Sequence, residues 1–304
     1  MINTFHDLVE KTQQRPIKSR MAVAGAHEKH TIESVIHAKK DGLCEPILVG
    51  IESEIRSLLA AEGESPDDYA IVSAEDGADS ARKAIALIRD GRAEILMKGA
   101  METGALMKEV INKEHGLNRG VRCSLIGLYE ISNYPKILAI GDVGMNTYPN
   151  LEGKRDILIG AVELLHSLGL ACPKAAILSA VEKVNPKMPD TVDGDALKTM
   201  WKNGELPECI VEGPISFDLA TRPEAAAIKH YDSPVAGDAD ILIVSDIVSG
   251  NVLAKALTGF AMAKTAGIVV GAAAPIVLSS RSAQVEDKYY SIALAAYSAG
   301  RDEA

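Results

Sequence analysis

The chain has 304 residues, of which 47% are hydrophobic and 24% charged. This is enough for two domains or one large one, with a composition typical of globular proteins. The net charge of −10 argues against a surface for nucleic acids or anionic membranes, and three Phe and one Trp leave few rings for stacking bases. An anionic substrate must therefore be bound by a local cluster of Arg, Lys and backbone N–H groups.

The cysteines are widely separated and have neither metal-ligand spacing nor the density of a disulfide framework: Cys44, Cys123, Cys172 and Cys209. We therefore expect reduced thiols, no metal site and a cytoplasmic protein. Residues 1–20 lack the apolar run of a secretory signal. Residues 259–278 have nearly the length of a membrane span, but their Lys, Gly and Pro residues predict two short buried elements instead.

From residue 2 to about 99, amphipathic stretches alternate with short apolar ones. Helices are predicted at 2–14, 29–42, 52–63 and 80–91, and strands at 21–25, 46–50, 69–73 and 94–99. This alternation predicts right-handed crossovers and a mainly parallel sheet. The binding crevice of such a sheet lies beyond the carboxyl ends of its strands.

The alternation breaks at residues 121–142, where two apolar runs are separated only by SNYP. So short a connection predicts an antiparallel hairpin, and we place the domain change there. A long helix ending near residue 167 should follow, and then a second series of strands and helices. Strands are expected at 174–180, 208–214, 239–246, 267–272 and 275–280, and helices at 195–204, 248–263 and 283–299, with a loop at 181–194.

The stretch Pro275–Asp287 is the strongest candidate for a functional turn, because an apolar strand ends there and a helix begins. A helix start offers backbone N–H groups and a partial positive charge to an anion. Arg281 adds a guanidinium, and Ser280 and Ser282 add hydroxyl groups. The alternative is structural: Ser282 is simply the N-cap, and Asp287 only complements the helix dipole.

A second candidate turn begins at Lys98, which closes a predicted strand. Gly99 permits a sharp turn there, and Thr103 or its neighbour Glu102 can start the next helix. The functional interpretation is that this turn is a binding site for phosphate or acyl phosphate. The alternative is an ordinary turn whose lysine points to solvent.

Two weaker candidates lie further along the chain. Asn146 follows the hairpin in a loop, where an Asx turn is the structural alternative. Ser249, Gly250 and Asn251 lie at a predicted helix start, which is a potential anion or amide site. The short motifs for dinucleotides, phosphate loops, metalloproteases and serine nucleophiles are absent from the sequence.

Several segments resemble the phosphate acetyltransferase and phosphate butyryltransferase family. They are EGPISFD (212–218), 235–257 and 275–296, while GDVGMNTYPNL (141–151) and SAVEKVNPKMPDT (179–191) resemble the butyryl branch more than the acetyl branch. The resemblance extends along essentially the whole chain. It implies a two-domain α/β fold of mainly parallel sheets with flanking helices, an isocitrate-dehydrogenase-like architecture.

The same resemblance implies that residues 1–133 and 279–304 form one domain and 134–278 the other, with the active cleft between them. It implies reversible transfer of a short-chain acyl group, butyryl first and acetyl as the alternative, between coenzyme A and inorganic phosphate. Coenzyme A is then a substrate, no cofactor is bound, and the partners are acyl-CoA, phosphate and acyl phosphate. The family also implies a homo-oligomer, a dimer or an assembly of dimers.

By resemblance, Asp287 matches the general base toward the CoA thiol, while Ser280 and Arg281 match the pair that holds the reacting acyl phosphate or CoA. The acetyl branch carries an Arg in the helix after the turn, where this chain has Lys108 nearby. Transfer of its phosphate-binding role to Lys98 or Lys108 therefore stays open.

The chemistry demands help for the base, because a thiol titrates near 8.5 and a free Asp near 3.9, a gap on the order of 6 kcal/mol. Burial of the carboxyl group or stabilisation of the thiolate must close it. We expect direct thiolate attack without an acyl-enzyme. The alternatives are a metal- and NAD-dependent dehydrogenase on the same fold, and a non-catalytic acyl-CoA sensor, which would have no need of the base.

Overall fold

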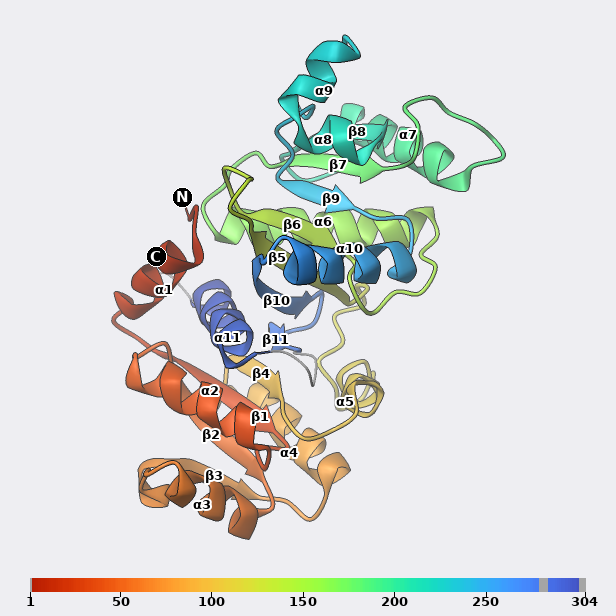
Figure 1. Ribbon diagram of the computed structural model, residues 1–304. Helices are drawn as coiled ribbons and strands as arrows, with labels where there is room; N and C mark the ends of the chain where they lie inside the picture. Colours follow the sequence, from red (N-terminus) through yellow and green to blue (C-terminus); the bar gives the residue numbers. More distant parts are fainter. Residues whose placement is uncertain (1, 279–283, 301–304) are drawn as a thin grey trace. The chain divides into compact units, whose positions relative to one another are not determined.

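The structure, a computed structural model, describes residues 2–278 and 284–300 (Figure 1). Its internal contacts divide the chain into two compact units. The first unit comprises Phe5–Val121 and Ala266–Ala304, and the second comprises Met1–Thr4 and Arg122–Thr265. The C-terminal helix thus belongs to the unit built by the N-terminal part of the chain. The domain boundaries expected at 133/134 and 278/279 stay a prediction.

The strands of the first unit follow the order β3-β2-β1-β4-β11-β10. They are β1 (Ser19–Ala24), β2 (Cys44–Gly50), β3 (Ala70–Ser73), β4 (Ile95–Lys98), most of β10 (Lys264–Val270) and β11 (Ile276–Val277). Neighbouring strands from β3 to β11 are parallel, and β10 is antiparallel to β11. The mainly parallel sheet predicted for this region is confirmed.

The helices of the first unit are connections between these strands, together with both ends of the chain. They are α1 (Phe5–Gln13), α2 (Lys29–Lys40), α3 (Glu52–Ala61), the 3-10 helix η1 (Pro66–Asp68), α4 (Gly77–Arg89), α5 (Thr103–Val110) and α11 (Val285–Ala299). Helix α11 packs against α1 and α2 (Figure 1). The ring of Phe5 stacks on that of Tyr290 at a centroid distance of 4.9 Å, which fastens the C-terminal helix to the start of the chain.

The order of the central strands determines where a ligand can enter. Residues Met21–Ala24 of β1 and Ile95–Met97 of β4 are completely buried, as expected for parallel strands covered by helices on both faces. The chain proceeds from β1 to β2 and β3 on one side, and β4 then pairs on the other side of β1. The neighbours β1 and β4 therefore form a topological switch point, where crevices open beyond the carboxyl ends of the strands.

The strands of the second unit follow the order β5-β6-β9-β7-β8. They are β5 (Ser124–Glu130), β6 (Leu138–Gly141), β7 (Lys174–Leu178), β8 (Ile210–Ile215) and β9 (Ile241–Ile243). Strands β5 and β6 are antiparallel, which confirms the predicted hairpin, and the remaining pairs are parallel. A buried cluster that includes Ile140, Leu242 and Ile215 forms the core on one face of this sheet.

The helices of the second unit are α6 (Leu151–Ser167), α7 (Pro189–Lys202), α8 (Phe217–Thr221), α9 (Pro223–Ile228) and α10 (Ile247–Phe260). The expected loop at 181–194 is wrong in its second half, since α7 already begins at Pro189. Proline is favoured at the first helical position, where its missing N–H costs nothing. Among the described residues, no helix is both long enough and apolar enough to span a bilayer.

Candidate active site

A pocket of about 430 Å³ lies at the topological switch point of the first unit, where the chain leaves β1 and β4. Its lining residues are Glu28, Gly99, Ala100, Met101 and Glu102. The two turns are joined by backbone hydrogen bonds, in which the N–H of Gly99 donates to Ala24 O and that of Ala100 to Gly25 O, both at 2.7 Å. The pocket wall is therefore built by two segments about 75 residues apart in the sequence.

Glycine is required where these turns meet. A Cβ atom on Gly99 would lie only 2.2 Å from the carbonyl oxygen of Gly25, far inside van der Waals contact. Gly25 itself has φ +70°, which favours glycine as well. The sharp turn expected at Gly99 is thus needed for the close approach of the two backbones.

Lys98 is only 6% exposed, so the alternative in which it points to solvent is wrong. Its ammonium group donates hydrogen bonds to the carbonyl oxygens of Gly99 at 3.2 Å and Met101 at 3.1 Å. The positive charge therefore lies within the turn that lines the pocket. Glu102 is the N-cap of α5 and Thr103 is its first residue, as the sequence suggested, and no capping bond is made by the Glu102 side chain.

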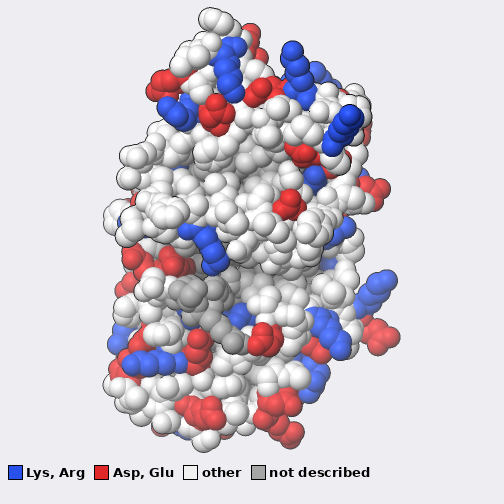
Figure 2. Space-filling model, turned by 45° about the vertical axis from the view of Figure 1, so that its right-hand side comes forward, with Lys and Arg blue, Asp and Glu red and all other residues white. Residues whose placement is uncertain are grey.

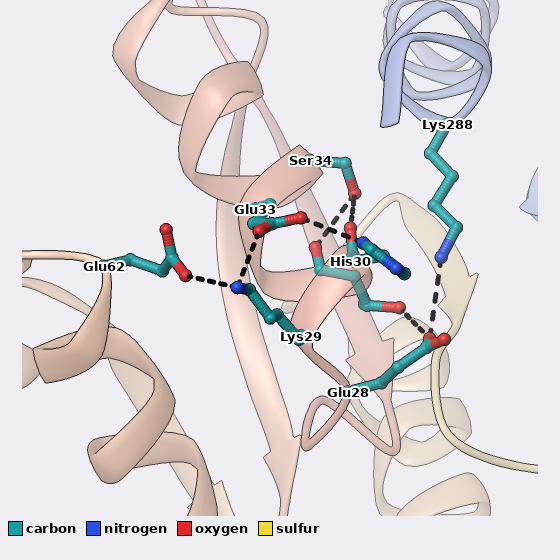
Figure 3. Close-up of polar contacts among 8 residues, drawn as sticks. Glu28, Lys29, His30, Glu33, Ser34, Glu62 and Lys288 are labelled. Carbon is teal, nitrogen blue, oxygen red and sulfur yellow. Dashed lines mark hydrogen bonds and ion pairs between the residues drawn. The ribbon is translucent and has the colours of Figure 1, made fainter. Parts of the chain in front are cut away.

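An ion pair that the sequence analysis missed lies at the same pocket. The Nζ atom of Lys288, on α11, is 3.6 Å from Oε2 of Glu28, the N-cap of α2 (Figure 3). The same oxygen accepts a 2.5 Å hydrogen bond from the hydroxyl of Thr31. The side chain of Lys288 is 2% exposed and that of Glu28 is 30% exposed, so the lysine is inside and its partner faces the pocket.

The pKa of Glu28 lies below its ordinary value. Burial opposes ionisation, but the hydrogen bond from Thr31 and the positive charges of Lys288 and Lys98 together outweigh burial. Glu28 is therefore an anion at neutral pH. Of the two glutamates that line the pocket, Glu28 is thus paired with the buried Lys288 and lies in the field of the buried Lys98.

Asp287 is placed in the first turn of α11. The helix begins at Val285 with Gln284 as N-cap, so the alternative in which Ser282 is the N-cap is wrong. The Oδ2 atom of Asp287 accepts a hydrogen bond from the backbone N–H of Gln284 at 3.2 Å. The Asp287 carboxylate therefore satisfies the backbone N–H of the N-cap residue, as an acidic side chain at the third helical position can. Ser280, Arg281 and Ser282 lie outside the described residues, and their roles stay predictions.

The second unit holds the other candidates around a buried carboxylate, Asp142, which follows β6 and is 2% exposed. Its two oxygens accept hydrogen bonds from the backbone N–H groups of Leu125, Gly144, Met145 and Asn146 at 2.7–3.3 Å. So many donors satisfy a buried carboxylate completely. Asp142 therefore organises the loop between β6 and α6.

Both polar atoms of the Asn146 side chain make hydrogen bonds. Its amide nitrogen donates to Asp142 Oδ2 at 2.5 Å and to Cys123 O at 3.0 Å, while its oxygen accepts a hydrogen bond from Arg122 at 3.1 Å. The Asx turn of this loop is made by Asp142, whose Oδ1 accepts the backbone N–H of Gly144 two residues on, and not by Asn146. Asn146 therefore links Asp142 to the exposed guanidinium of Arg122 and orients it. The sequence analysis did not consider Arg122.

Ser249, Gly250 and Asn251 lie one residue deeper in a helix than expected, because α10 begins at Ile247 with Asp246 as N-cap. Asp246 and Ser249 cap this helix reciprocally through each other's backbone N–H. A Cβ atom on Gly250 would lie 2.3 Å from Asp142 O, and the Asn251 amide donates to Val143 O at 3.3 Å. The structure thus brings Asn146, Gly250 and Asn251 to one loop, whose contacts are structural.

One of the missed residues had a detectable sequence pattern. Lys288 has the helical spacing of the buried Ile292 and Ala295, so it belongs to the inner face of α11.

In the part of the chain that the structure describes, no group of three His, Cys, Asp or Glu side chains could hold a metal ion. On the face seen in Figure 2, acidic and basic side chains are interspersed.

Comparison with known proteins gives these sites their context. Residues 70–296 match the family described as Phosphate acetyl/butaryl transferase. The chain belongs to this family. It is 40% identical over 300 residues to phosphate butyryltransferase from Clostridium acetobutylicum, covering 99% of each protein. It is also 40% identical over 280 residues to phosphate acetyltransferase from Thermotoga maritima, covering 91% of this chain and 94% of that protein.

A solved structure gives the same family assignment. The fold matches that of a branched-chain phosphotransacylase from Enterococcus faecalis V583 with a TM-score of 0.83 at 34% sequence identity, over 93% of this chain and 100% of the other. Membership of the phosphate acetyl/butyryl transferase family confirms the resemblance found in the sequence, and it does not favour the dehydrogenase alternative. Because relatives from both branches are 40% identical, overall similarity does not separate butyryl from acetyl.

Proposed function

We propose that the protein reversibly transfers a short-chain acyl group, butyryl in the first place, between coenzyme A and inorganic phosphate. The observation that carries this proposal is the 40% identity, over 99% of both chains, to a protein named phosphate butyryltransferase. Acetyl is the alternative group, supported by the phosphate acetyltransferase of equal identity. The two groups differ by two methylenes, about 1.6 kcal/mol of burial energy, so the pocket must discriminate by shape.

In the proposed mechanism, Asp287 takes the proton of the CoA thiol, and Ser280 and Arg281 hold the acyl phosphate. The thiolate forms a C–S bond at the carbonyl carbon, the C–O bond to phosphate breaks, and phosphate leaves with its electron pair. The helix start and the buried ammonium of Lys98 stabilise negative charge on the thiolate and the oxyanion, since Asp287 alone is too weak a base.

The remaining candidates divide between the two units. In the first unit we assign Lys98, Gly99 and Thr103, with Ser282, to the phosphate end of the substrate, supported by the pocket that the turn lines. In the second unit, Asn146 and residues 249–251 are assigned to coenzyme A. Because their described contacts hold the loop and the start of α10, we infer that they act by shaping the binding surface.

The same proposal includes a homo-oligomer built from dimers, on the strength of the family resemblance. The exposed apolar side chains Val248, Val252 and Phe260 on α10 are consistent with a subunit contact. It also includes a cytoplasmic location, supported by four free cysteines that a reducing compartment would preserve.

The test is release of free coenzyme A from acetyl-, propionyl-, butyryl- and isobutyryl-CoA, followed with a thiol reagent. We expect release that requires inorganic phosphate, is unchanged by EDTA and is fastest with a four-carbon chain. A maximum at acetyl-CoA would keep the reaction and change the branch. No phosphate-dependent release from any of the four would contradict the proposal, and a labelled acyl group trapped on the protein by butyryl-CoA alone would contradict direct attack.

A further inference from the structure

The ion pair between Glu28 and Lys288 occupies an unusual place. Lys288 directly follows Asp287, the proposed base, yet its side chain points inward and is 2% exposed (Figure 3). A buried ammonium is costly unless a counter-ion and hydrogen bonds compensate it, so its position depends on a nearby carboxylate. Glu28 supplies that carboxylate from another element, at the start of α2.

Glu28 is itself fixed in place. Thr31, which is 1% exposed, donates to the same carboxylate oxygen that faces Lys288. Glu28 also lines the pocket together with the turn after β4. The pair therefore links the first turn of α2, the first turn of α11 and the pocket wall.

A contrasting pair on the same helix shows that this arrangement is not general for α2. Lys29 is 63% exposed and lies within ion-pair distance of both Glu33 and Glu62 (Figure 3). Such exposed pairs are mobile, screened and worth little. The two neighbours Glu28 and Lys29 thus make ion pairs of opposite character, one turned to the buried helix α11 and one to solvent.

We propose that Glu28 and Lys288 are positioning residues that orient Asp287 for proton transfer, an inference that rests on the proposed acyltransferase function. Successive residues on a helix are about 100° apart, so anchoring Lys288 inward sets the rotation of the first turn of α11. The direction of the Asp287 side chain follows from that rotation. Its carboxylate is held from the other side by the N–H of Gln284.

The experiment compares Glu28→Gln, Lys288→Met and the double variant with the wild type, measuring kcat, KM and thermal unfolding. We expect each single change to lower kcat about tenfold or more, with KM changed by less than about twofold, because only orientation in the transition state is lost. Glu28→Gln should also unfold at a lower temperature, since it leaves a buried ammonium without its counter-ion.

The double variant separates positioning from stability. Replacing both charges by neutral groups of similar size should restore the unfolding temperature to near that of the wild type, while kcat stays low. Lys288→Arg, which keeps the charge, should recover part of kcat. Glu33→Gln is the matched control from the exposed pair, and its kcat should equal that of the wild type.

Two outcomes would overturn the inference, and they are distinguishable. A double variant that folds and has wild-type kcat would show that the pair does not orient Asp287, while the proposed function would stand. A wild-type enzyme without phosphate-dependent release of CoA would overturn the proposed function itself, and this inference with it.

Discussion

Asp287 combines two demands in a single side chain. Its carboxylate accepts a hydrogen bond from the backbone N–H of Gln284 and so serves the start of the helix. The proposed reaction needs it to accept a proton from a thiol. We infer that the surrounding positive groups act mainly on the thiolate. Lowering the pKa of the thiol narrows the difference between the pKa values of the thiol and of an aspartate without any change at Asp287.

Replacing Asp287 by Asn should reduce kcat about 100-fold or more while KM changes little, since general-base catalysis contributes on that order. The amide keeps an oxygen that can accept the Gln284 N–H, so the helix start and the unfolding temperature should be preserved. Steady-state kinetics and a thermal unfolding curve measure both. An Asn variant that turns over at the wild-type rate would exclude Asp287 as the base.

At the scale of elements, the site depends on how closely two turns approach. The turns after β1 and β4 are joined through Gly99, and neither would reach the other if a side chain intervened. The same principle operates in the second unit, where Gly250 of α10 packs on the backbone of Asp142. In both units a glycine therefore permits the contact that shapes the candidate site.

Gly99→Ala should lower the free energy of unfolding by about 2–3 kcal/mol and reduce activity, because its Cβ would force the backbone of Gly25 away. Gly104→Ala on α5 is the matched control, since its Cβ would meet no atom within 4 Å. That change should be neutral or stabilise by up to about 1 kcal/mol. Urea unfolding measures both. Equal stability of the two variants would mean that the turns can separate freely.

At the scale of the whole molecule, acid should act on both units through carboxylates that are paired in the folded state. In the first unit the pKa of Glu28 is lowered, as described above. In the second unit burial opposes ionisation of Asp238, but its contacts with Lys136 and Lys174 outweigh burial and lower its pKa. Such groups stabilise the fold only while they are ionised.

The sign of the pH dependence follows from these shifts. Folded pKa values lie below the ordinary values of 4.5 for Glu28 and 3.8 for Asp238, so their contribution is complete well above those values and declines as the pH falls through them. We expect the free energy of unfolding in urea to be similar at about pH 7 and pH 5.5 and clearly lower at about pH 3.5. Asp238→Asn should reduce this decline, and a pH-independent stability would contradict the assignment.

Much of this protein could be derived from its sequence, because the relevant patterns are local. Strand and helix periodicity predicted the parallel sheet, and the short SNYP connection predicted the hairpin. Turn chemistry pointed to Lys98 and Gly99. Gly99 lines the pocket, and the ammonium of Lys98 donates a hydrogen bond to its carbonyl oxygen. The long matching segments identified the family, which the comparisons confirm.

The tertiary structure alone decided which of these local features meet. The partners Glu28 and Lys288 are 260 residues apart, and only the packing of α11 against α2 brings them together. Lys98 can be buried because its ammonium donates hydrogen bonds to carbonyl oxygens of its own turn. The general preference of lysine for the surface does not predict this burial. Periodicity and turn chemistry act over a few residues, whereas strand order and side-chain burial depend on how the whole chain packs.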